Sequence, residues 1–138
     1  MTLFLIVGLV TGGYLLVVWA PIWVVHYEVK HVVRDYGNRA VKDPNDQQLV
    51  ADMCAKLRSL DSSRTLAEDG RVESRPSVVV DPVEVTWQRD TAARPPELRV
   101  AFTYRRDLYY PIVERWSEVE MQVDMVMDIG LPDWGPSR

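Results

Sequence analysis

Cysteine and histidine are scarce in this sequence, and their scarcity excludes several kinds of protein. The chain has one cysteine, Cys54, so no disulfide can form within it and a disulfide-stapled scaffold is excluded. Its two histidines, His26 and His31, are five residues apart, whereas two histidines that share a zinc ion on one helix are three or four apart. The sequence therefore offers neither a disulfide framework nor a helical zinc pair.

Catalytic motifs are missing as well. The sequence contains no glycine-rich phosphate loop and no GxSxG setting for a nucleophilic serine. Cys54 has no histidine near it in sequence and falls within an apolar helical stripe, which favours an inert buried thiol. The acidic residues between positions 118 and 128 alternate with apolar ones, which favours a solvated sheet face over a catalytic carboxylate pair. We therefore expect no enzymatic activity, no cofactor and no metal site.

Positive charge is not in excess. The chain of 138 residues carries 16 lysines and arginines against 20 acidic residues, a formal net charge of −4. A general nucleic-acid binder needs a basic patch or stripe, so we expect no nucleic-acid partner. The length suits one small domain with an appendage.

Charge is absent altogether from residues 3 to 25. As a helix with a rise of about 1.5 Å per residue, this run extends about 35 Å, enough to cross a hydrocarbon core of about 30 Å. A cleavable signal peptide would have a basic region before the run and an Ala-x-Ala site after it, and neither is present. We predict a retained transmembrane helix over residues 1–26, with the lipid bilayer as its first partner.

Small and aromatic residues mark candidate contact surfaces on this helix. Gly8 and Gly12 form a small-xxx-small pair, which lets a second helix approach closely, although glycine is also common in membrane helices for other reasons. Trp19, Trp23 and Tyr27 are spaced by four and so share one helix face. That face is either an aromatic belt at the lipid headgroups or a docking stripe for partner helices.

The C-terminal end of the run carries two further candidates. Pro21 removes a backbone hydrogen bond and predicts a kink. His26 lies at the predicted membrane edge, where it is either an interfacial histidine with its polar tip in water or an axial ligand to a tetrapyrrole such as haem. Beyond it an amphipathic helix should continue to Gly37, a residue suited to a left-handed cap.

A second helix should follow. Asp43 is its expected N-cap and Pro44 its first residue. One apolar stripe supports the prediction and consists of Leu49, Val50, Met53, Leu57 and Leu60. The polar, non-periodic residues 61–76 predict a loop.

Three strands complete the predicted domain. Period-two alternation runs through residues 83–87, 97–105 and 118–129, with the segment "RRDLYYP" as a break before the last strand. Short connections favour antiparallel pairing. The fold class is therefore α+β: a transmembrane helix that extends into an amphipathic helix, a second helix, and a three-stranded antiparallel sheet. We place the small α+β domain at residues 27–130 and an irregular tail at residues 131–138.

Basic residues flank only the C-terminal end of the uncharged run, namely Lys30, Arg34, Arg39 and Lys42. The positive-inside rule would then place the domain in the cytoplasm. A charged leader ahead of residue 1 would reverse this orientation.

The segments "MTLFLIVGLV", "APIWVVHYEVKHVV" and "LVADMCAKL" together resemble a bacterial single-span membrane family of unknown function. Its Pro-x-aromatic segment and Tyr-x-Val-Lys helix are matched here by Pro21, Trp23, Tyr27, Val29 and Lys30. The resemblance implies a protein of the bacterial cytoplasmic membrane whose domain is extracytoplasmic.

The first residues are also similar to a mature type IV pilin, which begins with an apolar helix. Pilins carry glutamate at the fifth position, where this chain has Leu5. Two functions follow as expectations. One is an accessory or stabilising subunit of a larger bacterial membrane complex, with other integral membrane proteins as partners. The alternative is a pilin-like structural subunit of an extracellular filament, which would bind copies of itself.

Overall fold

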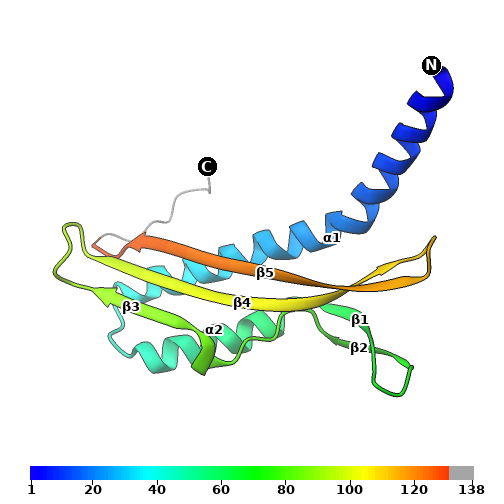
Figure 1. Cartoon of the computed structure of the whole chain (residues 1–138). Coiled ribbons are helices and arrows are strands. Elements are labelled where there is room, and N and C mark those ends of the chain that lie inside the picture. The colour runs from blue at the N-terminus through cyan, green and yellow to red at the C-terminus, as the bar shows by residue number, and fades with distance from the viewer. Residues whose placement is uncertain (131–138) are drawn as a thin grey trace.

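The computed structural model describes residues 1–130; the tail expected at residues 131–138 lies outside the described residues. The elements in chain order are α1 (Thr2–Ala40), α2 (Asp46–Arg58), β1 (Ser62–Leu66), β2 (Val72–Pro76), the 3-10 helix η1 (Pro82–Glu84), β3 (Thr86–Asp90), β4 (Glu97–Tyr110) and β5 (Arg115–Asp128). Strands β3, β4 and β5 form an antiparallel meander, and β1 pairs separately with β2 (Figure 1). The predicted α+β order of two helices and a three-stranded sheet is confirmed.

Helix α1 has a free N-terminal part and a C-terminal part that lies on the sheet, and it changes direction between them (Figure 1). Pro21 lies inside the helix, where its missing N–H predicts a bend. Ile22, Val25 and Val29 belong to the buried core. The buried core therefore includes residues of α1 that precede residue 27.

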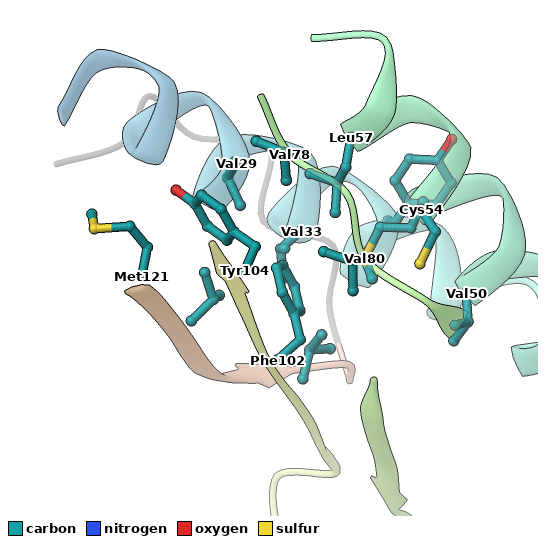
Figure 2. Packing of buried hydrophobic residues seen from close by; sticks show 14 of the residues in the cluster. Val29, Val33, Val50, Cys54, Leu57, Val78, Val80, Phe102, Tyr104 and Met121 are labelled. Atoms are coloured by element: carbon teal, nitrogen blue, oxygen red, sulfur yellow. The ribbon is translucent and has the colours of Figure 1, made fainter. Parts of the chain in front are cut away.

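A single core joins both helices to one face of the sheet. The inward side chains of β4, Leu98, Val100 and Phe102, are buried and alternate with exposed ones, as their period-two pattern predicted. Figure 2 shows side chains from α1, α2, the segment before η1, β4 and β5 that converge in this core: Val29, Val33, Val50, Cys54, Leu57, Val78, Val80, Phe102, Tyr104 and Met121.

The predicted register of the last strand is confirmed. Val123 of β5 is fully buried and pairs with Phe102 of β4. Met121 is buried, and Met125 lies partly buried against the core. The outward row is exposed and consists of Glu120, Gln122, Asp124 and Val126. This face of the sheet is available to solvent.

Helix α1 ends at Ala40 and not at Gly37, so the predicted cap is wrong. Gly37 is buried inside the helix, and a Cβ atom there would lie 2.5 Å from the sulfur of Met127. The glycine therefore gives room for the close approach of β5. At the true end of the helix, Arg89 of β3 donates from Nη1 to the carbonyl oxygen of Ala40, at 2.8 Å, and its guanidinium pairs with the Asp46 carboxylate.

Helix α2 begins two residues later than predicted. Asn45 is the N-cap, and its side-chain oxygen accepts a hydrogen bond from the backbone N–H of Gln48 at 3.3 Å. Asp43 accepts from the N–H of Asn45 instead, so it orders the turn ahead of the helix. Both residue types suit an N-cap, which is why the sequence alone misplaced the start.

Residues 62–76 form the β1–β2 hairpin, so the loop predicted at residues 61–76 is wrong over nearly all of its length. Gly70 supplies the left-handed backbone that its turn requires, with φ of +80°. The hydroxyl of Thr65 donates to the Asp107 carboxylate of β4 and ties the hairpin to the sheet. Because every residue of β2 is exposed, the hairpin carries no apolar alternation that a sequence pattern could reveal.

The first strand of the meander is also displaced from its predicted position at residues 83–87. Pro82–Glu84 form η1, and the Asp81 carboxylate accepts from the N–H of Val83 at 3.0 Å. Val83, expected to face the core, is 91% exposed. The proline and the capping aspartate therefore outweigh the alternation of this short segment.

Candidate membrane and partner surface

The free part of α1, which ends at about residue 17, carries a continuous apolar surface. Its exposed large side chains are Leu3, Phe4, Leu5, Ile6, Val7, Leu9, Val10, Leu15, Leu16 and Val17. Within residues 1–130, α1 is the one helix whose length and composition would allow it to cross a membrane, and its most apolar stretch is not covered by the rest of the molecule. An exposed apolar surface of this extent marks a site of membrane or protein contact.

Gly8 and Gly12 lie on this open surface, together with Gly13. A Cβ atom built at any of the three would meet no other atom within 4 Å. Packing within the described chain therefore does not explain the three glycines. Their positions leave the helix backbone accessible to a second helix, as the small-xxx-small spacing predicted.

The three aromatic residues of the predicted stripe are not equivalent. Trp19 is partly buried against the domain core, whereas Trp23 is 60% exposed and Tyr27 56%. A spacing of four residues advances about 40° beyond a full turn at each step, so the stripe drifts around the helix. The domain core covers part of Trp19 and leaves Trp23 and Tyr27 on the outer side.

His26 lies on the core side of α1 and is only 8% exposed. Its Nδ1 atom is hydrogen bonded to the hydroxyl of Tyr104 on β4, at 2.9 Å. Burial raises the pKa of Tyr104 to about 12, so this phenol stays protonated at neutral pH. The pair ties helix to sheet, a structural role that neither alternative drawn from the sequence included.

The turn between β4 and β5 reaches back to the uncharged part of α1. The backbone N–H of Ile112 donates to the hydroxyl of Tyr14, at 3.3 Å. On the flanking strands, the rings of Tyr109 and Trp116 lie 4.9 Å apart. The sequence predicted a break at residues 105–111, and this is wrong: residues 105–110 belong to β4, and the turn lies at residues 111–114. The signal that this prediction missed is the absence of charge from residues 108–113.

Arg106 is a charged residue in the inward row of β4. Its Nε and Nη1 atoms are buried and have no hydrogen-bond partner among residues 1–130. It follows Tyr104 and precedes Leu108 in the same row, both of which are buried. The period-two pattern predicts an apolar residue at each inward position of a strand, so it does not predict a buried arginine at position 106.

The remaining candidate chemistry is sparse in the part of the chain that the structure describes. No group of three or more histidine, cysteine or acidic residues among residues 1–130 is arranged to hold a metal ion. Cys54 is buried in α2, and burial raises the pKa of its thiol. The apolar surface of α1 is therefore the feature on which a function can be argued.

Comparison with known proteins adds no family. No protein-family model matches this chain, and no curated protein or solved structure matches it either.

Proposed function

We propose that this protein is a non-catalytic, single-pass membrane protein that acts as an accessory or stabilising subunit of a larger bacterial membrane complex. The observation that carries the proposal is the division of α1 into two surfaces. On one side Ile22, Val25 and His26 are buried, and His26 is hydrogen bonded to Tyr104 of β4. The other side leaves Trp23 and Tyr27 exposed, directly beyond the apolar free part.

The outer side of α1 suits a protein partner better than lipid alone. Trp23, Val24 and Tyr27 are exposed side by side over about one turn of the helix, where large aromatic residues commonly act as hot spots of binding. The open backbone at Gly8 and Gly12 continues this surface into the free part. A partner helix that follows α1 would contact both regions.

The packing of α1 gives such a subunit a fixed orientation. The helix runs from its free part into the domain core without a break, and the His26–Tyr104 hydrogen bond joins it to β4. A partner that binds the outer side would thus position the domain at the membrane surface. We place the protein in the bacterial cytoplasmic membrane with an extracytoplasmic domain, in line with the family resemblance and against the basic flank of α1.

A pilin-like filament subunit is the second candidate. The feature that favours it is the division of one long helix into an apolar free part and a part that lies on an antiparallel sheet. The free parts of several copies could then bundle together. Leu5 at the fifth position counts against this candidate, because it lacks the carboxylate that pilins carry there.

Gentle detergent extraction of the full chain separates the two candidates. An accessory subunit should elute with other integral membrane proteins in a complex of defined size, whereas a filament subunit should sediment as long polymers of one chain. Trp23→Ala should leave the protein in the membrane but weaken co-purification of its partners. Val83→Ala is the matched control, because Val83 is exposed on the domain far along the chain from α1.

The accessory-subunit proposal fails if the chain elutes alone or as homopolymers. It also loses its main support if Trp23→Ala and Val83→Ala retain partners equally, because Trp23 would then serve as a lipid belt only.

A further inference from the structure

The turn that joins β4 to β5 has the composition of a membrane-contacting loop. We call residues 109–116 the hairpin tip. Ile112 and Val113, at its end, are 74% and 65% exposed, and residues 108–113 carry no charge. Figure 1 shows that the tip extends past the point where α1 turns away from the sheet.

The hydrogen bond between Ile112 and Tyr14 fixes the level of the tip along α1. A hydrocarbon core of about 30 Å takes about 20 helical residues. If the core covers residues 3–22 of the uncharged run, Tyr14 lies about 12 Å inside its boundary along the helix axis, and any later placement puts it deeper. A helix that crosses the bilayer therefore carries the hairpin tip below the lipid headgroups.

We propose that the hairpin tip inserts into the same lipid leaflet as α1, with Ile112 and Val113 in contact with acyl chains. The protein then contacts the membrane at two points, one helical and one on the sheet. This inference rests on the proposed membrane anchor. The occupant is lipid, because the tip is hydrogen bonded to the very helix that enters the bilayer and moves with it.

The flanks of the tip fit this placement. The paired rings of Tyr109 and Trp116 are amphipathic and suit the headgroup level. Asp107 is the nearest charged residue on β4 and lies three residues before Tyr110, where the strand ends, a distance of about 10 Å at about 3.3 Å per residue. Arg115 is closer, but its long stem lets the guanidinium reach the headgroups.

One residue limits the depth of insertion. Glu114 follows Val113 in the turn, where it adopts a left-handed backbone with φ of 47°. A carboxylate is costly to bury in hydrocarbon, so Glu114 opposes any placement of α1 that would carry the tip to or across the midplane. With Tyr14 about 12 Å inside the boundary when the core covers residues 3–22, we expect Ile112 and Val113 to lie in the acyl region on the domain side of the midplane, which is about 15 Å from either boundary.

Fluorescence quenching in vesicles tests this arrangement directly. The full chain with Cys54→Ala receives one cysteine at position 112 or 113, is labelled with the environment-sensitive dye NBD, and is reconstituted into phosphatidylcholine vesicles without other proteins. Nitroxides on the acyl chains report contact with lipid, and iodide reports contact with water. Matched labels at Leu9, on the free part of α1, and at Val83, on η1, serve as lipid and water controls; both are exposed.

The inference predicts that labels at 112 and 113 emit at shorter wavelength, are quenched by nitroxide and are protected from iodide, as at Leu9. The label at Val83 should show the reverse. Quenching by iodide at 112 and 113, with lipid contact at Leu9, would overturn the insertion of the tip while the anchor stands; the tip would then face water or a protein partner. Iodide quenching at Leu9 as well would refute the anchor itself.

Discussion

Tyr104→Phe removes one hydroxyl group from the core and leaves the aromatic ring in place. Tyr104 is 2% exposed, and its hydroxyl is hydrogen bonded to Nδ1 of His26 at 2.9 Å. The apolar contacts of the ring survive the change, so the main loss is this bond, and it leaves a buried nitrogen of His26 without a partner. A buried polar group left unpaired costs about 1–3 kcal/mol, and we expect the free energy of unfolding to fall by that amount.

Urea titration of the detergent-solubilised chain, followed by tryptophan fluorescence, measures this loss. The midpoint should shift while the denaturant slope stays constant, because the surface exposed on unfolding is nearly unchanged. His26→Leu and the double variant complete a mutant cycle. The double variant should lose less than the sum of the single losses, with a coupling of about 1 kcal/mol. Additive losses, or a neutral Tyr104→Phe, would refute the role of this pair in joining α1 to β4.

The same residue predicts an alkaline effect. Its pKa is about 12 in the folded protein, raised by burial, against 10.0 as the ordinary value. Because the unfolded phenol ionises first, the stability that Tyr104 contributes is complete below pH 10 and is lost as the pH rises towards 12. The stability difference between the parent and Tyr104→Phe should therefore narrow across this interval.

Two further predictions concern the core. Val123→Asp places a carboxylate at a fully buried position and should lower the free energy of unfolding by more than about 4 kcal/mol, as measured by chemical denaturation. Glu120→Ala, on the exposed face, should leave the free energy of unfolding nearly unchanged. If Glu120→Ala were the more damaging change, the β5 register would be off by one. Cys54 is buried and the pKa of its thiol is raised, so at neutral pH a thiol reagent should label the folded protein only as fast as local or global unfolding exposes Cys54. Fast labelling without denaturant would contradict the burial of Cys54.

The elements that the sequence predicted best are those with one buried and one exposed face. Along β4 and β5 the alternation is long, and burial at Val100, Phe102 and Val123 follows it position by position. The stripe of α2 behaves in the same way at Met53 and Leu57. In each case the apolar residues of the repeating pattern are the ones buried in the single core, so local periodicity is sufficient to predict the element and its buried face.

The elements that were missed lack such a pattern or depend on distant contacts. The β1–β2 hairpin is exposed along β2, so burial imposes no alternation on it. Gly37 reads as a helix cap until Met127 of β5 is seen to occupy the space beside it. The spacing of Trp19 and Trp23 places them on nearly one face, but only the position of the folded core decides which of them is covered.

The hairpin tip shows the same limit at the candidate site. Residues 108–113 form too short an uncharged run to stand out as a membrane segment by themselves. Their proximity to Tyr14 depends on β4 running along α1, a contact between residues far apart in the chain. The membrane contact proposed for the hairpin tip can therefore be inferred only from the structure, which shows the tip beside α1.

Membrane retention of Leu16→Arg tests the central claim, that the free part of α1 lies in the bilayer, most directly. Leu16 is exposed in the middle of the uncharged run, and an arginine at the centre of a membrane helix costs about 2.5–3.5 kcal/mol on insertion scales. We predict that the parent and the control Leu66→Arg, on β1, stay in the membrane fraction after carbonate washing, whereas Leu16→Arg is released. Retention of Leu16→Arg alongside the parent would contradict the claim.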